Sequence, residues 1–584
     1  MGGSENDCWR TSRFYTFAGC IIAHMKRFSS NGSIANIIKH GAIPVLFYFF
    51  MFCLLTYPLI TKFPTHFFTD DGDGFMNIWN LWWVNTAVSQ PAVHPSIWHT
   101  ALLHYPFGIT LLGQTLNPFN GLLAVPLLRV MPLVQAHNAI VLFSFVMSGV
   151  TAYWLAYYLT RSFWGSLLAG YVFTFSSYHF AHYYGHLNLI SMEWIPLFVL
   201  CWYVLVTRPS VTMGLASALT LWLVLLCDYY YFFYCVLAGA LIVLWRMISQ
   251  RDLLFPARRE YRASLSLFIL SALILTGPIV FPLLYLTRID PLLDAHNPAS
   301  FALDLLALFI PGETWRFSPL TEGYWSKLPL YISEASVYLG YSVIVLVIYL
   351  VIKRRNMDVN TRSEVSLWFS IILFFFLMAL GPVLQIGGRV VYEALMPYTI
   401  LEKALPFLKL SGVPARMTVM VVLAASALSA LAISVLAKSP RGKVFALLIV
   451  ALFFVESLPG SLPFTSTDMP EYVSVLAELP DDGGVLDLAA PTKYRQLYYQ
   501  TAYRKPLVFG YVARTPSSVA EKEKELRRAI NRENYPALWS EYRVRYIVTR
   551  ELIEYDNPFV SIELVYQDDA VIIYRLECAC EDGE

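Results

Sequence analysis

The chain has 584 residues, of which 57% are hydrophobic, 16% are aromatic and only 14% are charged. Soluble globular chains carry about 25% charged residues, so this composition excludes that class and indicates a polytopic α-helical membrane protein. The formal net charge of +1 supplies no overall field for nucleic acid, and we expect no nucleic-acid partner. The eight cysteines lie mostly in or beside apolar segments, and they predict no disulfide framework.

The N-terminal segment, residues 1–40, is polar and basic. It lacks the charged, apolar and small-residue order of a cleaved signal peptide, so we expect a cytoplasmic segment whose true start is Met1 or Met25. The first predicted span, residues 41–61, follows directly. Its length matches the roughly 20 residues that a bilayer requires.

The acidic turn comes after the first span, and it consists of Asp70, Asp71, Gly72 and Asp73. Clustered acids at the water edge of a bilayer are costly unless the protein uses them. Aromatic residues at helical spacing follow within residues 75–86, and they predict a helix that lies in the membrane interface on its indoles. The alternative is that Asp71 or Asp73 only caps this helix, since aspartate is a favoured N-cap residue. One cap needs one acid, whereas the turn contains three.

Residues 91–135 are rich in proline and histidine and contain only short apolar pieces, so we expect them to be interfacial or re-entrant. Ten further spans are predicted, at residues 136–160, 164–181, 186–207, 211–227, 229–247, 263–287, 336–352, 363–382, 413–437 and 443–459. With the first span, they give a transmembrane core at residues 41–459 with about 11 helices.

Lysine and arginine residues gather in alternate loops, on the same side as the basic N-terminal segment. This bias places that side in the cytoplasm. The outer loops 62–135, 288–335 and 383–412 then face outward, as does the tail beyond residue 460.

Composition changes from Leu462 onward, where charged residues become frequent. Four short runs are typical of β-strands, at residues 485–488, 545–548, 563–566 and 570–574. Residues 567–569 predict a hairpin turn between the last two runs, and residues 521–532 predict a charged helix. We therefore expect residues 460–584 to form a soluble extracytoplasmic α/β domain, close to the usual domain size.

A histidine cluster follows the third predicted span. His179, His182 and His186 are three and four residues apart and predict one face of a helix on the outer side. A three-histidine zinc site is one interpretation, and an interfacial belt of histidine and tyrosine is another. The third is a set of donors for a phosphate or a sugar hydroxyl, with Asn188 and Glu193 as further candidates from the same segment.

Two charged residues stand near later span ends on the outer side. Glu334 closes the loop 288–335, and it is either an interfacial charge or a site residue. Arg416 begins the span at 413–437. Its side chain either snorkels to water or pairs with a phosphate, for which the planar guanidinium fork is suited.

Several segments together carry a resemblance to a known family: residues 69–74 with Asn77, 105–108, 180–187, Glu334 with 338–341, and 413–416. With the Asp-x-Asp in the first outward loop and the outward C-terminal domain, they resemble the GT-C superfamily of membrane glycosyltransferases, in a bacterial group with a glycosyltransferase-39-like core. The resemblance covers most of residues 41–584. It implies a multi-pass protein of the bacterial inner (cytoplasmic) membrane, a polyprenyl-phosphate sugar donor, and an extracytoplasmic glycan, lipid or protein as acceptor. It also implies an acid of the first outer loop as base or metal-associated residue, and Asp71 and Asp73 match that position.

We therefore expect a membrane glycosyltransferase in which Asp73 is the catalytic base and Asp71 is its partner. Further candidates for substrate binding are Asp70, Asn77, His182, His186, Asn188, Glu193, Glu334 and Arg416. The cofactor to consider is a divalent metal ion, and the expected partners are the lipid-linked sugar, membrane lipids and the envelope acceptor.

Two other functions compete with this hypothesis. One is a transporter or flippase of lipid-linked saccharide, and the other is a non-catalytic envelope assembly protein. The sequence contains no internal repeat and no matching pair of Gly/Pro-broken half-helices, which disfavours the transporter.

Overall fold

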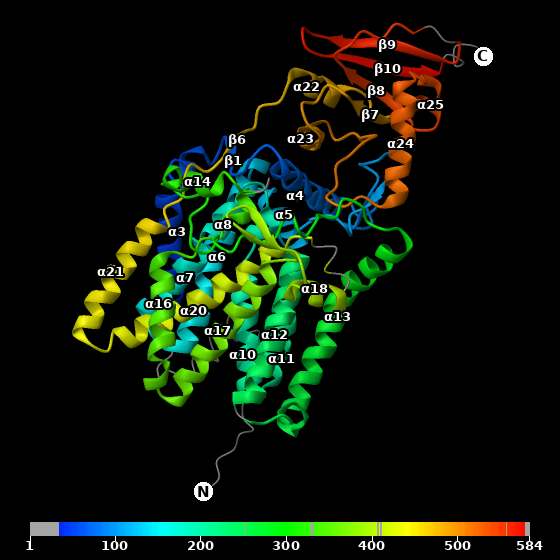
Figure 1. Ribbon diagram of the computed structural model, residues 1–584. Coiled ribbons are helices and arrows are strands. Elements are labelled where there is room, and N and C mark those ends of the chain that lie inside the picture. The colour runs from blue at the N-terminus through cyan, green and yellow to red at the C-terminus, as the bar shows by residue number, and fades with distance from the viewer. Residues whose placement is uncertain are drawn as a thin grey trace.

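Apolar helices build most of the molecule, and a smaller sheet-containing domain lies at one end of them (Figure 1). The computed structural model describes residues 34–249, 251–328, 332–405, 408, 412–555 and 558–578. Most of the predicted N-terminal segment 1–40 and the last residues of the predicted domain 460–584 lie outside the described residues.

The helical part contains α2 (Ile34–Ile37), α3 (Ile43–Leu55), α4 (Asp73–Ser89), α5 (Pro118–Leu127), α6 (Leu133–Thr160), α7 (Phe163–Thr174), α8 (Ser177–His182), α9 (Leu187–Ile190), α10 (Trp194–Thr207), α11 (Val211–Cys227), α12 (Tyr229–Ser249), α13 (Arg259–Ile289), α14 (Glu322–Trp325), α15 (Ile332–Ala335), α16 (Tyr341–Lys353), α17 (Val359–Ala379), α18 (Pro397–Ala404), α20 (Thr418–Leu436) and α21 (Pro440–Glu456). Short strands pair between these helices: β2 (His99–Thr100) with β3 (Ile109–Thr110), and β4 (Leu384–Ile386) with β5 (Arg389–Tyr392).

Six helices in the described part of the chain are long and apolar enough to cross a membrane: Ala35–Leu55, Leu133–Thr160, Tyr229–Ser249, Arg259–Ile289, Val359–Ala379 and Pro414–Leu436. The chain is therefore a multi-pass membrane protein, as predicted. Helices also occupy the other predicted ranges, but α7, α10, α11, α16 and α21 have only 12 to 17 residues each. The predicted count of about 11 spanning helices is not confirmed, because these helices are shorter than the roughly 20 residues that a span needs.

The centre of the helical part is α20, which packs against α6, α7, α16 and α17. Its side chains are buried along nearly the whole helix. Lipid tails are as apolar as leucine, so helices in a membrane associate through close packing, which small residues permit. Ala156 of α6, Ala169 of α7 and Ala430 of α20 form one such close contact.

The aromatic helix after the acidic turn is α4, and its position corrects one prediction. Trp79 and Trp83 are fully buried inside the protein and do not lie in a membrane interface. They are buried because α4 packs against α5 and against α23 of the C-terminal domain. The Trp79 indole donates a hydrogen bond to Gln500 Oε1 at 2.7 Å, and the ring of Phe75 stacks on Tyr498 with centroids 4.8 Å apart. The aromatic run therefore forms a docking surface within the chain.

The C-terminal domain contains α22 (Glu471–Glu478), β7 (Gly484–Asp487), α23 (Lys493–Tyr503), α24 (Ser517–Asn531), α25 (Tyr535–Ser540), β8 (Val544–Thr549), β9 (Val560–Gln567) and β10 (Ile572–Cys578). Its four-stranded sheet has the order β7-β8-β10-β9, with β7 parallel to β8 and the other pairs antiparallel. The predicted strands, hairpin turn and charged helix are confirmed. Asp568 closes the turn by accepting hydrogen bonds from the backbone of Ala570 and Val571.

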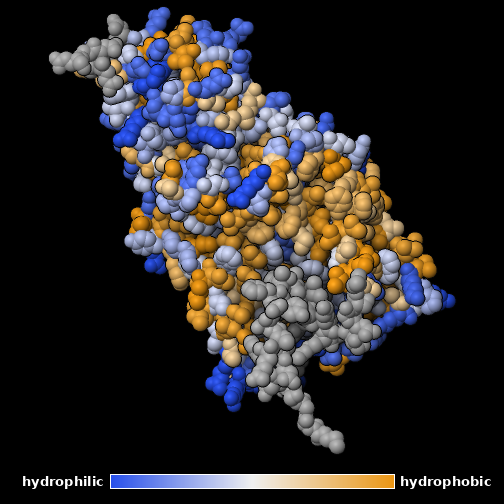
Figure 2. Space-filling view, turned by 180° about the vertical axis from the view of Figure 1, so that it is seen from behind, coloured by the Kyte–Doolittle hydropathy of each residue, from blue (hydrophilic) through white to orange (hydrophobic). Residues whose placement is uncertain are grey.

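A short strand pair ties this domain to the start of the core. β1 (His66–Phe67), just before the acidic turn, pairs antiparallel with β6 (Thr465–Ser466). Figure 2 shows apolar side chains over the helical part and hydrophilic side chains over the C-terminal domain. This division agrees with a membrane-embedded bundle that carries a water-exposed domain at one end.

Candidate active site

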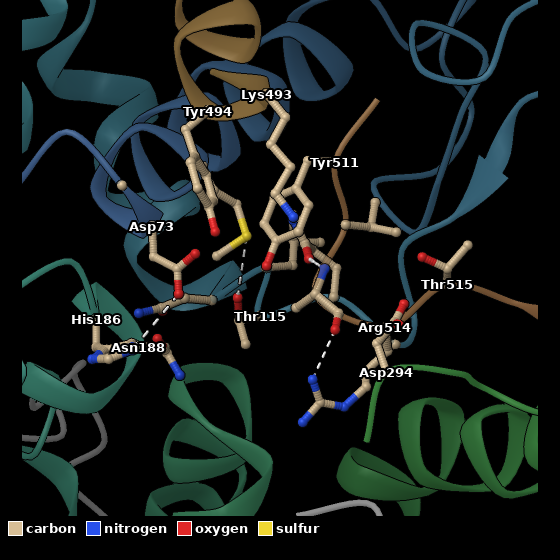
Figure 3. A pocket seen from close by; sticks show the side chains of 18 of the residues that line it. Asp73, Thr115, His186, Asn188, Asp294, Lys493, Tyr494, Tyr511, Arg514 and Thr515 are labelled. Carbon is tan, nitrogen blue, oxygen red and sulfur yellow. Dashed lines mark hydrogen bonds and ion pairs between the residues drawn. The ribbon is translucent and has the colours of Figure 1, made fainter. Parts of the chain in front are cut away.

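A cavity of about 1110 Å³ lies where the helices meet the C-terminal domain. Its walls come from the start of α4, residues 113–118, the junction of α11 and α12, residues 294–301, and residues 487–515. Figure 3 shows side chains from these parts pointing toward a common space. Segments from both ends of the chain therefore build one site.

Asp70 anchors the acidic turn. Its Oδ1 atom accepts hydrogen bonds from the backbone N–H groups of Gly72 and Gly74, each at 3.2 Å, and so satisfies donors at the start of α4. Burial raises the pKa of the Asp70 carboxyl, an effect that the Gly74 N–H and the nearby His186 oppose. Gly185 packs directly on this carboxylate, since a Cβ there would lie 2.7 Å from Asp70 Oδ1. Asp70 lines the cavity, but its contacts give it a supporting role.

Asp73 is the first residue of α4, and its carboxylate faces the cavity (Figure 3). Its Oδ2 atom lies 3.7 Å from Nε2 of His186, whereas its Oδ1 atom is buried and has no hydrogen-bond partner within 3.5 Å among the described residues. The Tyr494 hydroxyl of α23 points toward the same carboxylate. Asn77 donates to the backbone oxygens of Asp73 and Gly185, at 3.0 and 2.7 Å, and does not line the cavity. Asn77 therefore positions the start of α4 against the histidine segment.

Asp71 lies outside the cavity. Its side chain is 64% exposed, and its Oδ2 atom lies 3.6 Å from Nη2 of Arg495. The two carboxylates predicted to act as a pair therefore point to different sides of the turn, and Asp73 has His186 as its neighbour in place of Asp71. The capping role considered for Asp71 or Asp73 belongs to Asp70.

Glu334 and Arg416 form a buried ion pair beside the histidine cluster. Arg416 Nε lies 3.1 and 3.2 Å from the two carboxylate oxygens of Glu334, and only 5% and 7% of these side chains are exposed. Burial alone would raise the pKa of Glu334, but the Arg416 guanidinium outweighs it and holds that pKa well below the usual range. His182 Nε2 lies 3.5 Å from Glu334 Oε2. Both predicted residues therefore belong to one cluster that lines the cavity.

His182, His186 and Glu334 could also hold a metal ion. Each residue offers one ligand atom, and these atoms lie within 4.8 Å of one another. In the described chain, both ring nitrogens of His182 and Nδ1 of His186 are buried without a hydrogen-bond partner. Imidazole nitrogen and carboxylate oxygen are donors that a divalent ion such as zinc accepts, so the residues fit, with Glu334 shared between the ion and Arg416.

The remaining predicted residues have different surroundings. The two ring nitrogens of His179 lie 2.7 Å from the Thr174 oxygen and 2.9 Å from the Ile190 oxygen, so this histidine belongs to the core. Asn188 lines the cavity and donates to Asp228, which caps α12. Glu193 is buried and is not part of the cavity wall.

Sequence reasoning missed the contribution of the C-terminal domain. Lys493, Tyr494, Tyr511 and Arg514 all line the cavity (Figure 3). The rings of Tyr494 and Tyr511 meet edge to face with centroids 4.8 Å apart, and Lys493 Nζ lies 3.8 Å from the Tyr511 ring centre. Residues of these types are ordinary in a soluble domain, so only the docking of that domain marks them as site residues.

No curated protein matches this sequence. Among solved structures, the apo oligosaccharyltransferase of Archaeoglobus fulgidus is 12% identical, with a TM-score of 0.42 over 88% of this chain and 70% of that chain. The oligosaccharyltransferase AglB of the same organism, in complex with an inhibitory peptide and a dolichol-phosphate, is 11% identical, with a TM-score of 0.39 over 86% and 69%. ArnT from Cupriavidus metallidurans bound to undecaprenyl phosphate is 11% identical, with a TM-score of 0.40 over 95% and 100%.

At these low identities and TM-scores the likenesses assign neither a superfamily nor a role to this chain, and the roles of the site residues rest on their own geometry. One family model matches the sequence, over residues 69–455. This match includes the acidic turn, the histidine cluster, Glu334 and Arg416, and it ends before the C-terminal domain. The chain therefore belongs to the family described as a domain of unknown function, DUF6311.

Proposed function

We propose that this protein is a membrane glycosyltransferase that moves a sugar from a polyprenyl-phosphate donor to a hydroxyl group of an acceptor on the outer side of the membrane. The observation that carries the proposal is the cavity itself. It joins a carboxylate with a free oxygen, Asp73, to a wall that contains Arg416 and His186, at the end of a bundle of apolar helices. Transfer from a lipid-linked phosphate sugar needs all three: a base for the acceptor, a cation for the phosphate and an apolar surface for the lipid tail.

The transfer is a single displacement at the anomeric carbon of the donor. The acceptor oxygen forms a bond to that carbon while the bond from the carbon to the phosphate oxygen breaks, and the electron pair leaves with the phosphate. The acceptor proton passes to the Asp73 carboxylate, a step worth about 10²–10⁴-fold in rate. His186, at 3.7 Å, orients that carboxylate, and one displacement inverts the sugar carbon.

The neighbouring cluster of Glu334, Arg416 and the histidines would stabilise the departing phosphate. Arg416 keeps its position through the fork to Glu334, and its Nη1 atom makes no hydrogen bond to a described residue. We propose that His182, His186 and Glu334 hold a divalent metal ion, which when bound would neutralise part of the phosphate charge. The donor sugar and the acceptor belong to the classes expected from the sequence: a hexose or pentose, and a glycan, lipid or protein of the cell envelope.

The metal proposal has a direct test. Purified protein dialysed against zinc or manganese should retain about one equivalent by elemental analysis, and His182→Ala and His186→Ala should each lose it. His99→Ala, an exposed histidine outside the cluster, is the control and should retain the ion. Equal metal content in all four proteins, including none, would contradict the assignment.

The transferase proposal is tested with Asp73→Asn, which keeps the shape of the side chain and removes its basicity. Membranes or purified protein are incubated with a panel of radiolabelled polyprenyl-phosphate sugars, and label is followed from the lipid to product. We expect transfer to fall on the order of 10²-fold or more while donor binding and thermal stability stay near the parent values. Asp71→Asn is the matched control, and it should keep transfer because Asp71 lies outside the cavity.

Full transfer by Asp73→Asn would remove Asp73 from the chemistry. If label crosses the bilayer but always stays on the lipid, the protein is a transporter of lipid-linked saccharide. If label neither crosses nor leaves the lipid with any donor, the assembly function takes the place of the enzyme.

A further inference from the structure

The cavity has a second cationic corner at residues 513–515 of the C-terminal domain, beside the segment that follows α13. Leu293 N donates to Thr515 O at 2.8 Å, and Ser517 N donates to Pro291 O at 3.0 Å. Both side-chain oxygens of Asp290, which follows α13, accept hydrogen bonds from Ser518. These contacts fix the backbone that follows Arg514.

The helix that ends at this corner is apolar and faces outward. α13 has 31 residues, it is one of the six helices able to cross a membrane, and Phe281, Tyr285 and Ile289 near its end are exposed. Exposed apolar side chains on a spanning helix contact lipid. Arg514 therefore lies at the membrane edge, where the head group of a lipid would meet the cavity.

The Arg514 side chain extends into the cavity (Figure 3) and is more than nine-tenths buried. Its Nη1 atom donates to the Ala513 oxygen at 2.7 Å, but its Nε atom is buried without any hydrogen-bond partner in the described chain. No described carboxylate oxygen lies within 4.0 Å of it, including that of Asp294 in the same corner. The other arginines of the cavity wall are paired, Arg416 with Glu334 and Arg527 with Glu523.

A buried guanidinium with an unsatisfied donor is costly, and an anion with several acceptor oxygens would remove that cost. Tyr511 lies between this corner and the proposed base, within electrostatic reach of both Asp73 and Arg514 (Figure 3). An anion at Arg514 would thus lie in the same cavity as the proposed base, beyond one tyrosine ring.

We propose that Arg514 of the C-terminal domain binds the phosphate of a polyprenyl-phosphate lipid whose tail lies along α13. This inference rests on the proposed function, because it names the group that holds the donor of that reaction. It also gives the C-terminal domain a direct part in donor binding, beside Arg416 of the core.

The test measures binding and needs no turnover. Full-length protein in nanodiscs is titrated with a polyprenyl monophosphate, with the polyprenol of the same length, and with inorganic phosphate. Arg514→Gln should bind the polyprenyl monophosphate about 10- to 100-fold more weakly than the parent, the range expected for a lost charged hydrogen bond. Polyprenol binding should not change, Arg514→Lys should recover part of the affinity, and Arg532→Gln, an exposed arginine of the same domain, should match the parent.

Equal phosphate-lipid affinity in Arg514→Gln and the parent would overturn the inference, as would an equal loss for polyprenol, which indicates a structural defect. If inorganic phosphate alone binds tightly and Arg514-dependently while the phosphate lipid does not, the site takes free phosphate and the lipid assignment is wrong. The proposed function fails separately: it falls if label never leaves the lipid with any donor, whatever the affinity of the Arg514 variant.

Discussion

Gln500 connects the C-terminal domain to the helix of the acidic turn, and its replacement tests whether that domain is part of the site. Its Oε1 atom accepts from the Trp79 indole, and its Nε2 atom donates to the backbone oxygens of Leu102 and Lys505, at 2.6 and 3.0 Å. Gln500→Met keeps the length of the side chain and removes all three hydrogen bonds. The three partners lie in buried or partly buried positions, where water does not easily replace the lost contact.

Each buried polar group left without a partner costs about 1–3 kcal/mol. Two of these groups, on Trp79 and Leu102, lie outside the C-terminal domain, so their loss gives about 2 kcal/mol at the low end, which is on the order of a 30-fold change in the docking equilibrium. Hydrogen exchange measured by mass spectrometry should show amides of α4 and α23 exchanging faster by that factor in Gln500→Met. Gln567→Met, at an exposed end of β9, is the control and should exchange like the parent. Unchanged exchange of α4 in Gln500→Met would refute the reasoning that this residue holds the two parts together.

Three other predictions follow from single residues. Burial raises the pKa of Asp487 to about 6. The protonated carboxyl therefore contributes stability below about pH 4, and we expect about 3 kcal/mol of the free energy of unfolding to be lost as the pH rises through about 6. Asp487→Asn should flatten this dependence of the free energy of unfolding on pH, and an equal slope in both proteins would contradict the prediction. In thermal unfolding, Gly185→Ala should destabilise the protein by about 1–3 kcal/mol or more, because φ of Gly185 is +88° and Asp70 leaves no room for a Cβ. Gly323→Ala is the control: there is open space around Gly323, so this variant should be as stable as the parent. Reporter fusions at Lys353 and Gly483 should report opposite sides of the membrane, and matching signals would overturn the predicted orientation.

The sequence was sufficient for features that depend on composition and local pattern. Long apolar runs predicted the helices at the right places, and alternating apolar residues with an Asp-containing turn predicted β9 and β10. The prediction of a candidate site at the acidic turn followed from the cost of clustered acids at a membrane edge, and Asp70 and Asp73 do line a cavity. The predicted number of spanning helices is not confirmed, because five of the predicted spans are helices of only 12 to 17 residues and helix ends depend on packing.

Roles within the turn could not be predicted, because Asp70, Asp71 and Asp73 are chemically identical and close in sequence. The directions of the three side chains depend on which carboxylate accepts hydrogen bonds from the N–H groups of Gly72 and Gly74, and this is Asp70. Gly185, which is distant in sequence, packs on the Asp70 carboxylate. The indoles of α4 were misplaced for a related reason. An amphipathic aromatic helix fits a membrane interface and a protein interface equally well, and only the presence of α23 decides between them.

Because α4 packs against α23, the site cannot form until the C-terminal domain has been synthesised. Trp79 and Gln500 are 421 residues apart, so at roughly 5–20 residues per second about 20 to 80 seconds pass between their synthesis. During that interval the membrane helices can insert, but the aromatic side chains of α4 have no α23 to pack against. The lipid head-group layer is then the environment that they prefer. A chain interrupted before residue 490 therefore carries every candidate span of the described chain but lacks the cavity wall at residues 492–527, so the cavity cannot form before the C-terminal domain is made.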